Sequence, residues 1–314
     1  MHRALIGLGA NLGDRQQTLA FAVQRLREAA GILLEESWWH ETAAVGGPSG
    51  QPAFLNGAVT VATLLPPKPL LSVLQSIELE LGRQRTERWG ARVVDLDLLL
   101  YDDVVLDSDE LKLPHPRMAF RRFVLEPAAE IAADMVHPTT GWTVGRLFAH
   151  LIAASPHLAI AGLPGAGKTR LAKRLAEQSE SRLILDPAAD EFNADLISRR
   201  AALLQRAGWP LDRWTICDFW FDQALAEATV HADGNARHEI ENAWRRRRKE
   251  IMPPKLLAVL EPHHGRALPE SSDRMLRAIG ELARRPDQGP VVWLSSDRFE
   301  EAVAELLAAM HAMR

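Results

Sequence analysis

The chain has 314 residues and a nearly balanced charge, with 37 Lys and Arg residues against 41 Asp and Glu residues. This length predicts two domains, and the net charge of −4 argues against nucleic acid as a partner. The single cysteine, Cys217, excludes an intrachain disulfide and predicts a reducing, cytoplasmic location. The first ten residues lack the layout of a signal peptide, and no apolar run has transmembrane length, so we expect no membrane partner.

The most informative segment is a predicted strand over residues 93–101 that carries two carboxylates. Asp95 and Asp97 are two residues apart, so on a strand they point to the same face. Two acids this close repel each other unless cations neutralise them, and carboxylates together with substrate phosphates commonly hold Mg²⁺. Arg88 and Arg92 precede the acids and offer planar donors for phosphates. The alternative is an edge strand that shows both acids to solvent.

Further motifs surround this strand in a fixed order within the first 150 residues. In chain order they are a strand with a Gly/Asn turn at 4–14, a helical pattern at 15–30, Thr42, and the segments 52–59, 75–85, 113–118 and 121–127. Together with the acid pair, this set resembles the 6-hydroxymethyl-7,8-dihydropterin pyrophosphokinases, a folate-pathway family. The resemblance implies an α+β domain over residues 1–154, with a mainly antiparallel sheet and a ferredoxin-like core. It also implies transfer of pyrophosphate from ATP to the hydroxymethyl oxygen of a pterin, with release of AMP.

The resemblance also implies roles for individual residues. Asp95 and Asp97 match the ligands of two Mg²⁺ ions, ATP is the co-substrate, and Arg83 and Arg92 complete the implied catalytic set. The implied pterin site consists of Thr42, Val45, Phe54, Asn56 and Phe123, and the implied ATP site of Gln75, Glu78, Arg85, Trp89, His115 and Arg121. Taken alone, the two phenylalanines would be read as core residues. Ala43 and Ala44 replace prolines that are usual in the family, which predicts a looser pterin loop.

A second domain is predicted over residues 155–314, after a short linker at 154–156. A strand at 157–161 leads into the segment 162–169, and a helical pattern follows from 170 to 180. This is the complete P-loop pattern: Gly162, Gly165 and Gly167 let the backbone wrap a phosphate, Lys168 reaches the terminal phosphates, and Thr169 can hold Mg²⁺. Strand candidates at 183–185, 214–217, 256–260 and 291–294 alternate with helical stretches, which predicts an α/β, P-loop NTPase-type parallel sheet.

The chemistry of this second site has two interpretations. Asp186 after the second strand, the segment 217–222 and the segment 253–260 resemble deoxynucleoside kinases, but the arginine that follows the third-strand acid in that family is missing. One hypothesis is a kinase of a nucleoside or similar small molecule, with Asp186 or Asp218 as the base. The other is a non-catalytic nucleotide-binding or regulatory module.

Two further points concern charge and turnover. The basic run at 245–249 is interpreted as a solvated helix face rather than a phosphate clamp, because charge runs usually face water. Arg266, Arg274 and Arg277 are the remaining candidates for lid arginines. For the first domain, the competing hypothesis is a nucleotide-binding regulator without turnover, against which the clustered acids argue. The sequence does not predict an oligomeric state.

Overall fold

The computed structural model describes residues 1–314 except 49, 84–89, 188–191 and 263–267. Four residues singled out by the sequence therefore lie outside the described residues: Arg85, Arg88, Trp89 and Arg266. The chain divides into two compact units. Unit 1 contains Met1–Ile152 and His311–Arg314, and unit 2 contains Ala153–Met310. None of the described helices combines the length and the apolar character that crossing a membrane requires.

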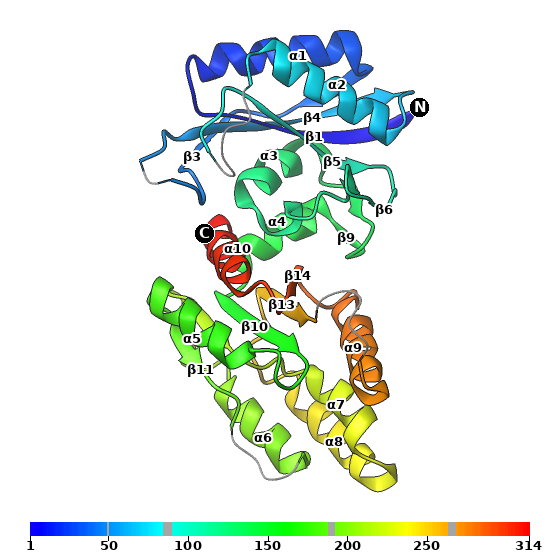
Figure 1. Ribbon diagram of the computed structural model, residues 1–314, viewed down its shortest axis with the longest axis vertical. Helices are drawn as coiled ribbons and strands as arrows, with labels where there is room; N and C mark the ends of the chain where they lie inside the picture. The colour runs from blue at the N-terminus through cyan, green and yellow to red at the C-terminus, as the bar shows by residue number, and fades with distance from the viewer. Residues whose placement is uncertain (49, 84–89, 188–191, 263–267) are drawn as a thin grey trace. The chain divides into compact units, whose positions relative to one another are not determined.

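Unit 1 is built on an antiparallel sheet with the strand order β2-β4-β1-β5 and with β3 paired to β4 (Figure 1). The strands are β1 (His2–Ala10), β2 (Ile32–Glu36), β3 (His40–Thr42), β4 (Phe54–Thr63) and β5 (Asp95–Tyr101). One face carries α1 (Arg15–Ala29) and α2 (Pro67–Glu80), and the other carries α3 (Arg122–Ala132) and α4 (Val144–Ala153). The described part of unit 1 also contains short elements: β6 (Leu106–Asp107), β7 (Lys112–Leu113), η1 (Met118–Phe120), β8 (Val136–His137) and β9 (Trp142–Thr143). The predicted α+β fold is confirmed.

The two faces of β1 differ because side chains alternate along a strand. Ile6 and Leu8 are buried in the core cluster that also contains Leu19 of α1 and Leu74 of α2. Gly7 and Gly9 occupy the alternate positions and line the opposite face. Because neither glycine has a side chain, this face of β1 leaves space that other groups can occupy.

Unit 2 is built on a parallel sheet with the strand order β11-β12-β10-β13-β14. The strands are β10 (His157–Gly162), β11 (Arg182–Ile184), β12 (Thr215–Cys217), β13 (Leu256–Glu261) and β14 (Val291–Ser295). The helices in the described residues are α5 (Lys168–Ser179), α6 (Ala194–Leu203), α7 (Gln223–His231), α8 (Gly234–Arg247), α9 (Glu270–Ala283) and α10 (Phe299–Ala312). The predicted parallel sheet is confirmed.

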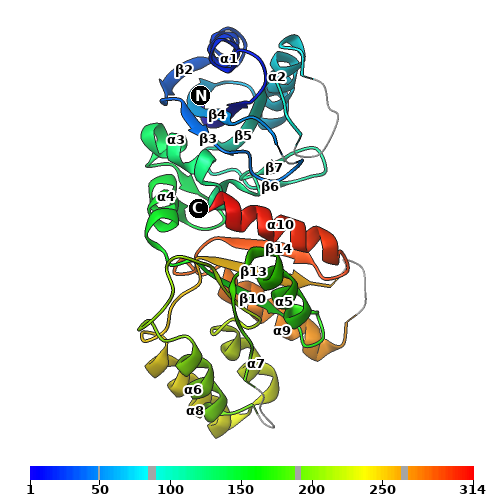
Figure 2. The ribbon, with the colours of Figure 1, turned by 90° about the vertical axis from the view of Figure 1, so that its left-hand side faces the viewer.

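Within unit 2, helices lie on both faces of this sheet (Figures 1 and 2). The start of α5 contacts the start of α10, where the guanidinium of Arg170 lies 4.0 Å from the ring centroid of Phe299. α9 packs on the side away from α5, against α7 and β10. β10 is the central strand, so the loop that follows it opens at the middle of the carboxyl edge, which is the usual position of ligand sites in open α/β sheets.

Candidate active sites

The paired acids of β5 face a cavity in unit 1 of about 220 Å³. In the sheet register Asp95 lies opposite Gly9 and Asp97 lies opposite Gly7, so both carboxylates stand on the face that the glycines leave open. The alternating residues Leu96 and Leu98 enter the core instead. β5 is an edge strand, as in the alternative interpretation of the sequence, but its two acids line a cavity and do not simply face solvent.

Two arginines hold the first of these acids. Arg83 Nη2 lies 2.8 Å from Oδ1 of Asp95, and Arg92 Nη1 lies 2.6 Å from its Oδ2. Burial and the adjacent Asp97 carboxylate raise the pKa of Asp95, while the two guanidinium groups oppose this rise. Opposite charges thus gather at one side of the cavity, in the arrangement that a polyphosphate with its counter-ions would require.

Glu78 of α2 lies behind this cluster. Its carboxylate accepts the backbone N–H of Leu96 at 2.7 Å and pairs with Arg83. Burial raises the pKa of Glu78 to about 7, against the lowering by the Leu96 N–H and by Arg83. Neither Glu78 nor Gln75, both expected in the ATP site, is among the described residues that line the cavity. Glu78 is placed to orient Arg83.

The residues expected to bind the pterin come together at the other side of the same cavity. Thr42, Val45, Phe54, Asn56 and Phe123 all line it, together with Ala43 and Ala44. The Asn56 amide donates a hydrogen bond to Thr42 Oγ1 at 2.8 Å. Both phenylalanine rings are only half-buried, in contrast to the core role that each would have by composition alone.

The floor of the cavity is formed by glycines. A Cβ atom on Gly9 would lie 3.1 Å from Oδ1 of Asn56, and one on Gly7 would lie 3.2 Å from Cδ1 of Leu99. A side chain at Gly9 would therefore crowd the Asn56 amide, which is expected to form hydrogen bonds with the edge of the pterin.

His115 and Arg121 also line the cavity. The His115 ring is 4.0 Å from Asp97 Oδ2, and its Nδ1 accepts the backbone N–H of Arg117 at 3.2 Å. Burial lowers the pKa of His115, and although Asp97 raises it, Arg121 and Arg117 lower it further. At neutral pH the ring is therefore a neutral hydrogen-bonding group.

The sequence did not predict a role for three residues that line or support the cavity. Arg117 and Gln51 line the cavity. Asn11, which is 2% exposed, accepts the backbone N–H of Arg92 at 2.8 Å and donates to the Pro52 carbonyl at 3.3 Å. The Gly/Asn turn after β1 was visible in the sequence, but the two loops that Asn11 joins are distant along the chain.

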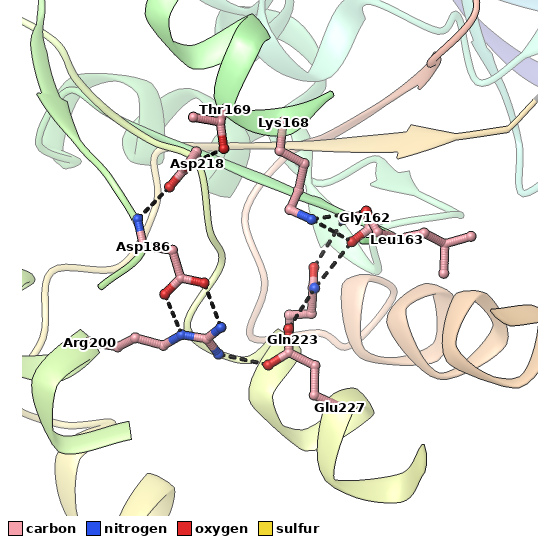
Figure 3. Close-up of polar contacts among 9 residues, drawn as sticks. All are labelled: Gly162, Leu163, Lys168, Thr169, Asp186, Arg200, Asp218, Gln223 and Glu227. Carbon is pink, nitrogen blue, oxygen red and sulfur yellow. Dashed lines mark hydrogen bonds and ion pairs between the residues drawn. The ribbon is translucent and has the colours of Figure 1, made fainter. Parts of the chain in front are cut away.

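The P-loop of unit 2 has the strand–loop–helix context that the sequence predicts. Gly165 and Gly167 have φ values of +77° and +87°, which favour glycine. Lys168 Nζ donates to the carbonyls of Gly162 and Leu163, at 3.0 Å each (Figure 3). Burial lowers the pKa of Lys168, while the nearby carboxylates, Glu227 first, raise it.

Asp218 joins the P-loop to the segment after β11. The hydroxyl of Thr169 donates to Asp218 Oδ2 at 2.5 Å, and the backbone N–H of Asp186 donates to Asp218 Oδ1 at 2.6 Å (Figure 3). The structure thus brings together both candidate bases and the candidate Mg²⁺ ligand at the carboxyl edge of the parallel sheet.

The basic run at the end of α8, residues 245–249, is only in part a solvated face. Arg245 and Arg247 are exposed and pair with acids one helical turn away. Arg248 instead pairs with the buried carboxylate of Asp222, at 2.8 Å from Nε to Oδ1. For this arginine, which caps the end of α8, the interpretation as a solvated residue is wrong, because its side chain reaches an interior acid.

Comparisons with known proteins match the first part of the chain. A family model described as 7,8-dihydro-6-hydroxymethylpterin-pyrophosphokinase (HPPK) matches residues 5–133. A 2-amino-4-hydroxy-6-hydroxymethyldihydropteridine pyrophosphokinase of Synechocystis sp. is 45% identical over 147 residues, which cover 46% of this chain and 74% of that protein. The Pseudomonas aeruginosa protein of the same name is 39% identical over 169 residues, which cover 53% of this chain and 99% of that protein.

Solved structures give weaker likenesses. A deoxyadenosine kinase from M. mycoides has a TM-score of 0.40 at 10% identity and covers 50% of this chain and 100% of that chain. The wild-type HPPK-DHPS of Plasmodium falciparum has a TM-score of 0.39 at 12% identity and covers 99% of this chain and 85% of that chain. At these values neither likeness carries an argument about function.

Proposed function

The chain belongs to the 7,8-dihydro-6-hydroxymethylpterin pyrophosphokinase family, and on this premise we propose that unit 1 transfers pyrophosphate from ATP to 6-hydroxymethyl-7,8-dihydropterin in folate biosynthesis, with release of AMP. The observation that carries the proposal is the single cavity that Asp95, Asp97, Arg83 and Arg92 share with Asn56. One side of this cavity has the charges for a polyphosphate, and the other has an amide and two aromatic rings for a flat heterocycle.

The donor set supports Mg²⁺ as the metal. Asp95 and Asp97 would hold it with hard oxygen ligands, and we propose two ions at this pair. Among the described residues no group of three or more His, Cys, Asp or Glu side chains is placed to hold a metal. The remaining ligands would therefore be phosphate oxygens and water, as is usual for Mg²⁺. When bound, the metal supplies positive charge that makes the phosphorus easier to attack.

The protein's own residues then position the substrates. Arg92 and Arg83 now neutralise Asp95, and when the acids hold a cation these guanidinium groups are free to bind phosphate oxygens. Glu78 keeps Arg83 pointed into the cavity. Phe54 and Phe123 would stack on the pterin, and Asn56 and the backbone of the 42–45 loop would read its edge.

The test is AMP formation from ATP and hydroxymethyldihydropterin. We expect Asp97→Ala to abolish it while the protein remains folded. Asp107→Ala, which removes an exposed acid paired with Lys112, is the matched control and should retain activity. Undiminished AMP release by the Asp97→Ala protein would refute the proposal.

For unit 2 we propose phosphoryl transfer from ATP to a small molecule, with release of ADP. The supporting observation is that Lys168, Thr169, Asp186 and Asp218 converge at one edge of the sheet. The competing proposal is a nucleotide-binding module without turnover. ADP and AMP distinguish the two units, so acceptor-stimulated ADP formation in the Asp97→Ala full chain would favour the kinase.

A further inference from the structure

A buried arginine in unit 2 has no role in the functions proposed above. Arg200 of α6 is 5% exposed. Its Nε and Nη2 donate to the two carboxylate oxygens of Asp186, at 2.8 and 2.7 Å, and its Nη1 donates to Glu227 Oε2 at 2.7 Å (Figure 3). One planar guanidinium therefore fixes two acids from different elements, with the bidentate geometry that orients a carboxylate most firmly.

This cluster is tied to the start of the P-loop. Glu227 Oε1 accepts a hydrogen bond from Gln223 Nε2 at 3.0 Å. The Gln223 side chain in turn accepts the N–H of Gly162 at 3.0 Å and donates to its carbonyl at 3.2 Å. Because Asp218 links the Asp186 backbone to Thr169, Asp186 is anchored to both ends of the P-loop.

A buried network of charges adds little net stability, because the desolvation of the charged groups offsets their mutual attraction. Burial alone lowers the pKa of Arg200, but the hydrogen bond with Asp186 and the charge of Glu227 raise it overall, so the group stays charged. Replacement of a buried ion pair by apolar side chains of similar size often leaves the stability of the protein unchanged or increases it. A charged cluster at a P-loop is therefore better explained by the orientation it imposes on a functional group.

Asp186 is the member of this network with open surface. Its side chain is 35% exposed, against 6% for Arg200 and 15% for Glu227. Asp218 is only 5% exposed. Of the two candidate bases, Asp186 is the one that an acceptor can reach.

We infer that Arg200, held in place by Glu227, is a positioning residue that aims Asp186 at the hydroxyl group of an uncharged small-molecule acceptor. The inference rests on the kinase function proposed for unit 2. In the step, the acceptor oxygen forms a bond to the γ-phosphorus of ATP, and the bond from that phosphorus to the β-phosphate oxygen breaks. The hydroxyl proton passes to Asp186, and ADP leaves.

The charge of the cluster sets the class of acceptor. Asp186, Asp218 and Glu227 carry three negative charges against two positive charges on Lys168 and Arg200. This excess repels an acceptor that already carries a phosphate or carboxylate, whereas a neutral hydroxyl donates readily to a carboxylate. Alcohols such as nucleosides or sugars fit, and their phosphate esters do not.

The test measures ADP formation by the Asp97→Ala full chain with ATP, Mg²⁺ and a panel of nucleosides and hexoses, beside the corresponding 5′- and 6-phosphates. We expect a neutral member to stimulate ADP release more than its phosphate ester does. Arg200→Met should then lower kcat about 10²-fold through misplacement of Asp186, with the KM for ATP within about twofold of the parent. Arg199→Met, at the neighbouring exposed arginine that pairs with Asp195, is the matched control and should retain kcat.

Two conservative variants keep the test decisive if Arg200→Met fails to fold. Arg200→Lys keeps the charge but loses the bidentate contact, and Glu227→Gln keeps the shape but loses one charge, so both should lower kcat more than they change the KM for ATP. An unchanged kcat in these variants, with an active parent, overturns the positioning role alone. Stimulation only by phosphorylated acceptors overturns the acceptor class, and ADP release that no acceptor stimulates overturns the kinase proposal together with the inference.

Discussion

Asn11 and Arg92 are joined by two hydrogen bonds that run in opposite directions. The Arg92 N–H donates to Asn11 Oδ1 at 2.8 Å, and the Asn11 N–H donates to the Arg92 carbonyl at 3.1 Å. The same Asn11 side chain donates to Gln51 and Pro52. One buried amide therefore anchors the segment that carries Arg92, which we propose binds phosphate, and the segment that leads into β4.

This relationship predicts that Asn11→Ala misplaces both segments. The lost hydrogen bonds of a buried polar group cost about 1–3 kcal/mol, so we expect kcat/KM for AMP formation to fall about 10–100-fold. Asn11→Asp keeps the acceptor for Arg92 but loses the donor for Gln51 and Pro52. The two variants should thus separate the contributions of the two segments in steady-state kinetics, and wild-type kinetics in both would contradict the anchoring role.

Phe123 should contribute to affinity for the pterin rather than for ATP. Its ring lines the cavity, with the Arg121 guanidinium 5.5 Å from its centroid. Loss of the ring removes stacking and apolar contact, so Phe123→Ala should raise the Kd of the pterin about tenfold or more in calorimetric titrations. Phe21→Ala, at an exposed ring on α1, is the control. Equal weakening of ATP and pterin would argue against a stacking role.

Glu78 should make unit 1 less stable as the pH rises. Burial raises its pKa in the folded state from 4.5 to about 7. Between these pH values the folded state binds more protons than the unfolded state, so the free energy of unfolding falls with increasing pH, by at most about 1.4 kcal/mol per pH unit. Hydrogen exchange at the core amides of β1 and β5 measures this free energy.

The comparison that tests this prediction is Glu78→Gln, which should lose less stability than the wild type between pH 5 and pH 8. Glu80→Gln, at an exposed acid on the same helix, controls for the loss of a carboxyl group from α2. Identical pH dependence in the wild type and Glu78→Gln would show that the Glu78 carboxyl does not govern this stability.

The neighbouring arginines Arg247 and Arg248 at the end of α8 should differ sharply in their contribution to stability. Among the described residues, Arg248→Met leaves the buried Asp222 carboxylate with the neutral donors Trp244 and Gln288. We expect a loss of about 2–3 kcal/mol, less than for a fully buried pair because 21% of the Arg248 side chain is exposed. Arg247→Met removes an exposed pair with Glu250 and should cost less than about 0.5 kcal/mol. Denaturant titration of unit 2 measures the free energy of unfolding of each variant. Equal losses in the two variants would contradict the prediction.

The sequence predicts the parts of both sites that depend on local spacing. Asp95 and Asp97 share a face because strand side chains alternate, and the P-loop is contiguous from Gly162 to Thr169. Glu78 is predicted for the ATP site; the structure adds that it accepts the N–H of Leu96, an interaction that depends on how α2 packs against β5. A contact between distant elements leaves no periodic signal in either segment.

The same limit explains what was not anticipated in unit 2. Arg200 stands on a helix where neighbouring arginines alternate between solvent and interior, and only the position of Asp186 shows which one is buried. The missing arginine after the third-strand acid was visible in the sequence. The buried guanidinium beside Asp186 was not, because it comes from α6.

Gly9 pairs with Asn56 on one neighbouring strand and with Asp95 on the other. The separation between the group expected to read the heterocycle and the group expected to gather the cations is thus two interstrand spacings, or about 10 Å, set by main-chain hydrogen bonds alone. Substitutions in the surrounding loops, including the alanines at 43 and 44, can alter the affinity for substrates without changing this distance between Asn56 and Asp95. Insertion of a residue into β1 would shift the register that pairs Gly9 with both residues.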